Sequence, residues 1–386
     1  MDDLIPYARQ WVDEQDIKSV TEVLKGDWLT TGPKIEEFEK KFADFVDAKY
    51  AVTLSSGTAA LHASSFAAGI KKGDEVIVSP MTFAASSNCI LYQNGKPVFA
   101  DIDKKTYNIN PEKIKEKITD NTKAIIPVDY SGHPCKIKKI MKIAKKHDLT
   151  VVEDASHAVG ATIDGKKIGG LADMSVFSFH PVKIITTGEG GIVTTDREEF
   201  YEKLIKFRNH GITKDHNQFV NKNTDPWFYE QQYLGYNYRL TDLQCALGIS
   251  QLKKVNMFLE KRREIAKKYT DNFKDLKGVI PPYQKRNVES SWHLYVIQLE
   301  LEKLKVDRKK IFNDFLEKKL GVQVHYIPVY YHPYYQKSGY KKGICPNAEW
   351  LYKRIITIPL YPKMTEEDVG RVIEIVNEII DKYIKD

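Results

Sequence analysis

Apolar strand-like segments alternate with helical segments between residues 50 and 195, and this alternation constrains the fold more than any other feature. Short β-rich runs predict strands at 50–54, 74–78, 97–100, 124–128, 150–154, 174–179 and 191–195. Helices are predicted between several of them, at 59–68, 84–93 and 136–147. Apolar strands separated by helices indicate a mostly parallel sheet that is covered by helices on both faces. The predicted fold class is therefore α/β.

The segments on either side of this region extend the prediction to two domains. Helices are predicted at 13–25, 34–46 and, as one or two long helices, 237–273. After Gly278, strands at 292–297 and 322–326 and helices at 307–319 and 365–384 predict an α+β unit. Because 386 residues are too many for one compact core, we expect a large domain over 1–250 and a small C-terminal domain over 251–386. The polar, aromatic-rich residues 213–232 predict a long flexible loop.

Three polar motifs follow predicted strands directly. They are Ser56-Gly57-Thr58, Asp154 and Lys183. Ligands of open parallel sheets bind beyond the carboxyl ends of the strands. We therefore expect these three motifs to meet at one edge of the sheet.

Lys183 differs from most other lysines of the chain, because Val182, Ile184 and Ile185 surround it. Apolar surroundings disfavour the charged ammonium and make the neutral amine easier to reach. A neutral amine can attack a carbonyl and form a Schiff base. Alternatively, the side chain only extends out of a core strand to solvent. This segment alone leaves both interpretations open.

The two other motifs also allow a binding role and a structural role. Ser56-Gly57-Thr58 places hydroxyls and free N–H groups at a helix start, where an anion is favoured, but it could be an ordinary helix cap. Asp154 could pair with a protonated pyridine nitrogen, or it could cap the turn that follows.

Neighbouring residues are equally ambiguous when each is taken alone. His157 could contact a ligand or be a structural histidine. Ser178 could bind a phosphate, and Phe83 could stack on a flat heteroaromatic ring or belong to the core.

Together these pieces resemble a known family, the DegT/StrS-like sugar-nucleotide aminotransferases. The matching segments run nearly end to end, at 29–33, 56–62, 73–77, 82–85, 153–160, 177–183, 187–191, 208–211 and 235–240. The resemblance implies fold type I and the cofactor pyridoxal 5′-phosphate (PLP). Some relatives carry histidine in place of the Schiff-base lysine and are sugar dehydratases, so the presence of Lys183 favours transamination.

The resemblance also implies a role for each matching residue. Lys183 would carry the Schiff base and then move protons, Asp154 would pair with the ring nitrogen, and Phe83 would stack on the ring. His157, where many relatives have glutamine, would contact the ring oxygen. The phosphate would be held by Gly57, Thr58, Ser178 and, from a neighbouring subunit, Asn237. The active enzyme would then be a homodimer with shared active sites.

A narrower resemblance connects the chain with the C4 aminotransferases of pseudaminic acid biosynthesis. It rests on Tyr7, the 28–30 turn, and residues 154–158, 179–183 and 321–326. It implies transfer of an amino group from L-glutamate to a UDP-linked 2-acetamido-2,6-dideoxy-4-keto-hexose of β-L-arabino configuration. The sugar and diphosphate pocket would be lined by Tyr7, Trp28, Leu29, Thr30, Arg239, Gln323, Val324, His325 and Tyr326.

Several alternatives remain beside this interpretation. Residues 323–326 could be an ordinary alternating strand. Another UDP- or dTDP-linked 3- or 4-keto-sugar could be the substrate. A PLP-binding regulatory protein without catalysis belongs to a different class, and the intact Lys183 and Asp154 count against it.

The bulk composition disfavours other classes of protein. The net charge of +7 comes from lysines spread along helical faces, which argues against a nucleic-acid partner. The 4 cysteines lack metal-ligand spacing, so we expect free thiols, a reducing compartment and no metal. No secretion signal or membrane-length apolar run is apparent, and we expect a cytoplasmic enzyme without a membrane partner.

Overall fold

A seven-stranded sheet forms the centre of the computed structural model, which describes residues 4–222 and 225–385. The strand order is β1-β9-β8-β5-β4-β2-β3, and all strands run in one direction except β9. The strands are β1 (Tyr50–Leu54), β2 (Glu75–Val78), β3 (Lys96–Phe99), β4 (Thr122–Ile126), β5 (Thr150–Asp154), β8 (Met174–Ser178) and β9 (Gly191–Thr195). The mostly parallel α/β sheet predicted from the sequence is thus confirmed.

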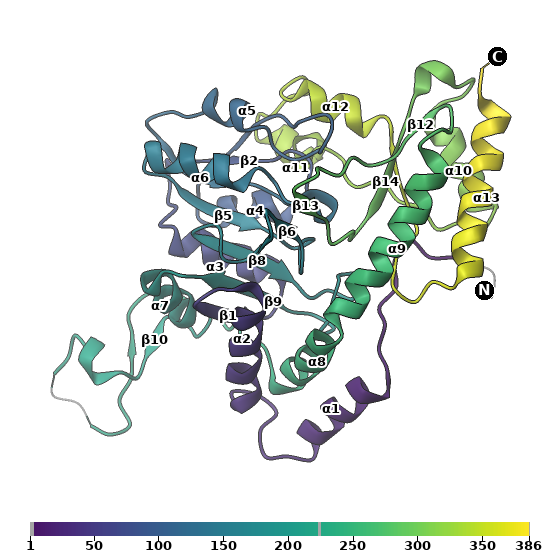
Figure 1. Cartoon of the computed structure of the whole chain (residues 1–386). Coiled ribbons are helices and arrows are strands. Elements are labelled where there is room, and N and C mark those ends of the chain that lie inside the picture. Colours follow the sequence, from purple (N-terminus) through teal and green to yellow (C-terminus); the bar gives the residue numbers. More distant parts are fainter. Residues whose placement is uncertain (1–3, 223–224, 386) are drawn as a thin grey trace.

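Helices cover both faces of this sheet (Figure 1). Adjacent residues of one strand point to opposite faces, so each strand contributes side chains to the cores on both sides. Val152 and Val176 pack in one core, whereas Val151 and Phe177 pack in the other. The first core includes side chains of α3 (Gly57–Ala67), α4 (Ala85–Tyr92) and α7 (Glu198–Phe207). The second core includes side chains of α2 (Pro33–Val46), α5 (Pro111–Lys115), α6 (Ile137–Lys146) and α8 (Asp242–Lys253).

The first helix, α1 (Glu14–Leu24), packs against α8. Asp13 begins it as predicted: its carboxylate accepts hydrogen bonds from the N–H groups of Gln15 and Asp16.

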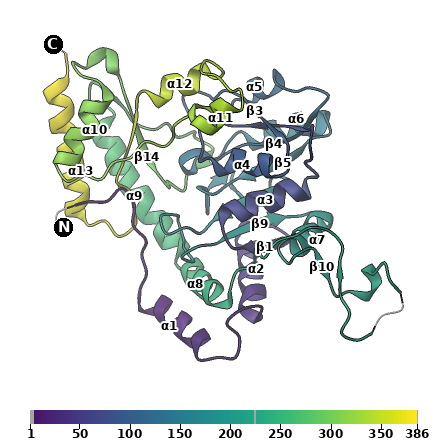
Figure 2. The ribbon, with the colours of Figure 1, turned by 180° about the vertical axis from the view of Figure 1, so that it is seen from behind.

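A third core lies around a small sheet in the C-terminal part. Figure 2 shows this part of the chain from behind. Its order is β12 (Val279–Ile280), β14 (Tyr295–Leu299) and β15 (Ile355–Ile358). It packs against the helices α9 (Val255–Phe273), α10 (Arg308–Glu317) and α13 (Glu366–Tyr383). Ile5 belongs to this core as well, so the segment around Ile5 lies beside the C-terminal part. The division at residue 250 remains a proposal.

Two strand predictions in this region need correction. Residues 322–326 form no strand: only Gln323 pairs with Thr357, in an isolated bridge. Side-chain hydrogen bonds hold the residues that follow: His325 bonds to Thr357, and Tyr326 bonds to His157. The strand expected at 292–297 begins only at Tyr295, because Trp292 has a φ of 49°, which a strand cannot contain.

Short elements complete the fold. A small sheet joins β13 (Val288–Glu289), β6 (Thr162–Ile163) and β7 (Lys166–Lys167). The helices α11 (Pro333–Lys337) and α12 (Pro346–Tyr352) and the 3₁₀ turn at Val329–Tyr331 pack on the first core. Further 3₁₀ turns lie at Tyr130–Gly132, His216–Gln218 and Leu301–Lys303. All four cysteines are free and buried, as expected.

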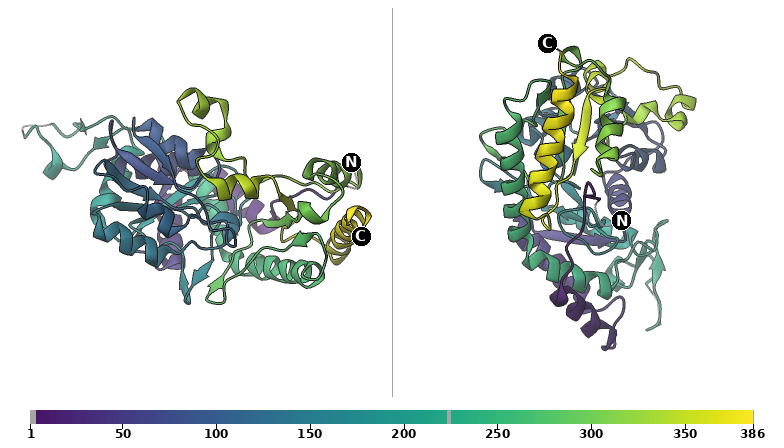
Figure 3. Two further views of the ribbon diagram at one scale, coloured as in Figure 1. Left: turned by 90° about the horizontal axis from the view of Figure 1, so that it is seen from above. Right: turned by 90° about the vertical axis from the view of Figure 1, so that its right-hand side faces the viewer.

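The loop predicted at 213–232 contains a short hairpin of β10 (Ile212–Thr213) and β11 (Glu230–Gln231). We call its described residues, 212–222 and 225–231, the arm. Figure 3 shows that the arm extends from the body on the side opposite α13. Trp227 and Tyr229 on the arm are exposed. Among the described residues, no helix combines the length and the apolar character needed to cross a bilayer.

Candidate active site

A cavity of about 560 Å³ lies at the carboxyl ends of β1, β5 and β8. Twelve of the residues selected from the sequence line it: Tyr7, Gly57, Thr58, Phe83, Asp154, His157, Ser178, Lys183, Gln323, Val324, His325 and Tyr326. The three strand-end motifs therefore meet at one edge of the sheet. This volume is large enough for a drug-sized ligand.

Lys183 enters the cavity from the loop after β8, where its backbone N–H donates to the carbonyl of His180 at 2.9 Å. Burial lowers the pKa of the Lys183 amine to about 8, and the nearby Asp154 carboxylate partly opposes this shift. Ile184 and Ile185, the next two residues, are buried and anchor the loop. A sizeable fraction of the amine is therefore neutral near pH 8 and can act as a nucleophile.

Asp154 ends β5 with its side chain 5% exposed, and two donors orient its carboxylate. Ser86 Oγ–H donates to Oδ2 at 2.6 Å, and the N–H of Ser156 donates to Oδ1 at 3.1 Å. Thr82 Oγ1 lies 2.7 Å from Ser86 Oγ and extends this chain of hydroxyls. Such a carboxylate is suited to a cationic partner inside the cavity, such as a protonated ring nitrogen.

Ser86 was not predicted from the sequence. The signal that could have found it is the pair of hydroxyl residues, Thr82 and Ser86, four positions apart at the start of a helix that follows a strand.

The start of α3 forms an anion site beside Ser178. Ser56 caps the helix by accepting a hydrogen bond from the N–H of Ala59 at 3.0 Å, which leaves the first-turn N–H groups of Gly57 and Thr58 directed outward. A Cβ at Gly57 would lie 2.9 Å from Cβ of Ser178, so only glycine permits this close approach. The helix dipole, the N–H groups and two hydroxyls fit a phosphate group.

Phe83 offers a platform for a flat ring. Its side chain is 64% exposed although it lines the cavity, whereas the flanking Thr82 is buried. An exposed aromatic face beside a buried carboxylate and an anion site suits a heteroaromatic ring that carries a phosphate.

Three buried histidines form another part of the cavity wall. His157 Nδ1 accepts from the N–H of Ser131 at 3.3 Å, and its Nε2 lies 3.1 Å from the hydroxyl of Tyr326. Because Nδ1 is an acceptor, the proton of the neutral ring sits on Nε2. Burial, with a smaller effect of the Lys183 charge, holds the pKa of His157 well below its usual value. His157 is thus a neutral donor.

His293, which sequence reasoning missed, lies with its ring 4.4 Å from that of His157. Burial also lowers the pKa of His293, and it lowers the pKa of His325 to about 4. His325 Nδ1 lies 2.9 Å from Thr357 Oγ1. Three neutral imidazoles therefore surround Lys183 without adding positive charge.

The remaining predicted residues, Trp28, Leu29, Thr30, Asn237 and Arg239, do not line this cavity. The first three lie exposed on the turn between α1 and α2, where Thr30 pairs with Thr241. Asn237 is exposed and pairs with Asn209, to whose Oδ1 atom Arg239 donates at 2.6 Å. Within one chain these residues form part of the outer surface.

Comparison with known proteins agrees with this geometry. The family model for the DegT/DnrJ/EryC1/StrS aminotransferase family matches residues 10–377. An uncharacterized protein of Methanocaldococcus jannaschii is 48% identical, over 98% of this chain and 98% of that protein. The spore coat polysaccharide biosynthesis protein SpsC of Bacillus subtilis is 43% identical, over 97% of each chain. A UDP-4-amino-4,6-dideoxy-N-acetyl-beta-L-altrosamine transaminase of Campylobacter jejuni is 38% identical, over 99% of each.

Solved structures have the same fold. PseC of Helicobacter pylori, an aminotransferase of pseudaminic acid biosynthesis, matches with a TM-score of 0.91 and 34% identity, over 98% of this chain and 100% of that one. A Streptococcus pneumoniae protein described as a sugar aminotransferase, in its PLP form, has a TM-score of 0.91 and 30% identity, over 98% and 99%. With a cavity whose ring platform, carboxylate and phosphate cradle fit PLP, the chain belongs to the DegT/DnrJ/EryC1/StrS aminotransferase family and is a PLP-dependent aminotransferase.

Proposed function

We propose that this aminotransferase moves an amino group from L-glutamate to C4 of a UDP-linked 2-acetamido-2,6-dideoxy-4-keto-hexose of β-L-arabino configuration. The product would be UDP-4-amino-4,6-dideoxy-N-acetyl-β-L-altrosamine, a precursor of pseudaminic acid. A sugar as the amino acceptor is supported by relatives that match nearly the whole length of this chain. The particular sugar is supported by the 38% identity to the Campylobacter jejuni transaminase and the likeness to PseC.

The observation that carries the amine chemistry is the low pKa of Lys183 beside Asp154 in one cavity. Bound PLP supplies an electron sink for the carbon that exchanges its amino group. Lys183 Nζ would hold the cofactor and then accept the proton released from Cα of glutamate. In the second half-reaction it would return a proton to C4 of the sugar.

The other residues of the cavity hold and orient the two reactants. Asp154, fixed by Ser86 and Ser156, would keep the ring nitrogen protonated. Gly57, Thr58 and Ser178 would bind the phosphate, and Phe83 would stack on the ring. His157, a neutral donor through Nε2, would reach the ring oxygen.

The sugar would bind between the N-terminal segment and residues 323–326. Tyr7 lies with its ring 5.5 Å from His325, so two segments far apart in sequence meet at this end of the cavity. Tyr7, Gln323, Val324, His325 and Tyr326 line it from one chain. We propose that Trp28, Leu29, Thr30, Arg239 and Asn237 complete the site from a second copy in a homodimer. A cytoplasmic location stays a prediction.

A second acceptor is favoured by one observation. The identity to SpsC, 43%, exceeds the 38% identity to the altrosamine transaminase, and SpsC is named for the biosynthesis of spore coat polysaccharide. The alternative is therefore another UDP- or dTDP-linked 3- or 4-keto-6-deoxy sugar.

A panel of nucleotide keto-sugars separates the two. The purified enzyme, PLP and glutamate are incubated with UDP- and dTDP-linked 3-keto and 4-keto sugars of both configurations, and amino sugars are detected by mass spectrometry. We expect the highest kcat/KM for the β-L-arabino 4-keto UDP sugar. A dTDP sugar or a 3-keto sugar turned over faster would refute the proposed substrate, and no product from any of them would refute sugar transamination.

A further inference from the structure

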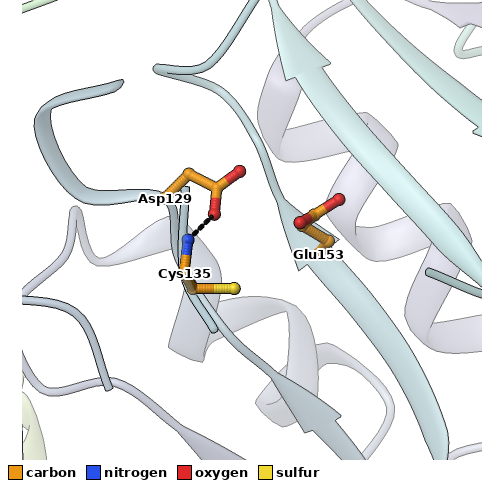
Figure 4. Close-up of side chains that lie close together, drawn as sticks. All are labelled: Asp129, Cys135 and Glu153. Carbon is orange, nitrogen blue, oxygen red and sulfur yellow. Dashed lines mark hydrogen bonds between the residues drawn. The ribbon is translucent and has the colours of Figure 1, made fainter. Parts of the chain in front are cut away.

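Two further buried carboxylates, Asp129 and Glu153, lie close together with Cys135 (Figure 4). Glu153 precedes Asp154 on β5, so its side chain points to the opposite face, away from the cavity. Asp129 lies beside it, after β4. Both side chains are 0% exposed.

Asp129 is joined to Asp154 through the backbone. The N–H of Asp129 donates to the carbonyl of Asp154 at 3.0 Å, and the N–H of Asp154 donates to the carbonyl of Pro127 at 2.9 Å. A change in the position of Asp129 therefore acts on the strand end that presents Asp154.

One oxygen of each carboxyl has a donor and the other does not. Asp129 Oδ1 accepts from the N–H of Cys135 at 2.8 Å, and Glu153 Oε2 accepts from Ser175 Oγ–H at 2.8 Å. Asp129 Oδ2 and Glu153 Oε1 have no hydrogen-bond partner among the described residues. One oxygen of each carboxyl and Cys135 Sγ lie within 4.8 Å of one another. Two ionised carboxylates in this position would each keep one oxygen without a donor, which is costly in a protein interior.

The charges around the pair add no compensation. The titratable groups that act on it are Asp154, whose charge raises the pKa of both carboxyls, and Cys135, whose thiol lowers the pKa of Asp129 without carrying a charge. Burial, the first cause, and the Asp154 charge raise the pKa of Asp129 to about 7. Burial and then the Asp129 charge raise the pKa of Glu153 well above its usual value. Burial and both carboxylates raise the pKa of the Cys135 thiol as well, so the thiol stays protonated and is a poor metal ligand.

We propose that Asp129 and Glu153 share one proton and act together as a positioning pair for Asp154. Because Asp129 Oδ2 and Glu153 Oε1 lack a donor, we place the proton between the two carboxyl groups, where it leaves one negative charge on the pair instead of two. It holds Asp129 against Glu153 and thereby fixes the backbone that carries Asp154. The shared proton stands independently of the proposed sugar, whereas the positioning role rests on the proposed pairing of Asp154 with the PLP ring nitrogen.

Amide substitutions test the shared proton without opening a cavity. In Asp129→Asn the amide oxygen can still accept from Cys135, while the NH₂ group donates to Glu153 in place of the proton. Glu153→Gln offers the reverse arrangement. Asp120→Asn, at an exposed carboxylate, is the matched control.

The first readout is unfolding by urea at a series of pH values. Folded Asp129 holds its proton with a pKa of about 7, and an unfolded aspartate does so near 3.8. Asp129 therefore releases a proton on unfolding between these values, and this contribution alone raises the unfolding constant about tenfold per pH unit across the window. The buried histidines, whose pKa values are lowered, contribute in the opposite direction, and they do so equally in the wild type and the variants. We expect the unfolding constants of the wild type and of Asp120→Asn, each divided by that of Asp129→Asn at the same pH, to rise with pH across this window. An equal pH dependence in all three proteins would overturn the proposal.

The second readout needs no variant, and it applies if the variants fail to fold. Infrared spectra of the wild-type holoenzyme at pH 6 should show the carbonyl band of a buried carboxylic acid, which disappears above the pKa of the pair. Absence of the band would overturn the proposal. So would one zinc ion per chain in the purified protein, since a metal would then occupy the place of the proton.

Cofactor affinity tests the positioning role. We expect Asp129→Asn to retain the PLP affinity of the wild type and Asp129→Ala to weaken it several-fold, although residue 129 does not line the cavity. Equal loss in both variants would refute positioning by the shared proton. None of these measurements involves the sugar, so they can fail or succeed separately from the substrate panel.

Discussion

At the scale of single residues, the environment of Lys183 separates it from the other lysines of the chain. Its amine is desolvated but stays close to Asp154, and these two influences act in opposite directions on its pKa. The sequence predicted the apolar neighbours and hence the direction of the shift. It could not predict the size of the shift, because burial depends on Tyr326, His157 and other side chains that are distant in sequence.

The first prediction concerns the pH at which Lys183 captures PLP. Since a lowered lysine pKa makes the neutral amine available at lower pH, the rate of PLP attachment to the apoenzyme should rise with pH and level off above about 8. Asp154→Asn removes the charge that raises this pKa, so its midpoint should lie at lower pH. Stopped-flow absorbance of the bound cofactor measures both. Lys183→Ala should abolish the absorbance change, while the exposed control Lys166→Ala should keep it. A midpoint above pH 9 in the wild type would contradict the prediction.

The second prediction concerns Ser86, whose hydroxyl is one of two donors to Asp154. A hydrogen bond to a charged group is worth about 1.5–3 kcal/mol, so Ser86→Ala should weaken PLP binding by roughly ten- to a hundredfold. Ser86→Thr retains the hydroxyl and should restore most of the affinity. Equilibrium dialysis of PLP measures the three proteins. Equal affinity of the alanine and wild-type proteins would show that Ser156 alone holds the carboxylate.

At the scale of elements, the phosphate cradle depends on how closely α3 approaches β8. The sequence predicted the ends of the strands around it to within two residues, because short apolar runs mark buried strands directly. It predicted the helix start at residue 59, whereas α3 begins at Gly57, so the binding residues lie within the first turn. The strand expected at 322–326 was wrong because side-chain bonds from His325 and Tyr326 hold that segment toward the cavity.

The third prediction tests this approach. Gly57→Ala would place a Cβ 2.9 Å from Ser178 Cβ and push α3 from the strand. We expect PLP affinity to fall by at least about tenfold, because the N–H groups of the first turn then miss the phosphate. Gly370→Ala in α13 is the control, since nothing lies within 4 Å of its Cβ, and it should stabilise the fold by about 0.5–1 kcal/mol. A Gly57→Ala protein with normal PLP affinity would place the phosphate elsewhere.

At the scale of the whole molecule, one chain builds only part of the proposed site. The residues that line the cavity share one edge of the sheet, whereas Trp28, Leu29, Thr30, Asn237 and Arg239 lie on the outer surface. The arm on the same polypeptide exposes Trp227 and Val220, two large apolar side chains that a second copy could cover. These observations support the proposed homodimer with shared sites.

The fourth prediction uses mixed dimers. Lys183→Ala and Asn237→Ala proteins should each be inactive alone, but after mixing and subunit exchange a hybrid dimer has one site with both native residues. Random exchange makes half of the dimers hybrid, so about a quarter of the wild-type activity should return. Activity is measured with the preferred keto-sugar, and sedimentation velocity checks that dimers form. No recovery in exchanged dimers would mean that Asn237 does not act on the partner's site.

The sequence by itself determined the alternation of strands and helices, and with it the edge of the sheet where Gly57, Asp154 and Lys183 meet. Periodicity reports which face of an element is buried, and the carboxyl ends of parallel strands share one edge. Only the tertiary structure brought Tyr7, His293 and residues 323–326 to the same cavity, and only it placed Ser86 on Asp154. It also brought Asp129 and Glu153 together without a cation. Such contacts, and the pKa shifts that follow from them, depend on desolvation by distant segments, which no local pattern records.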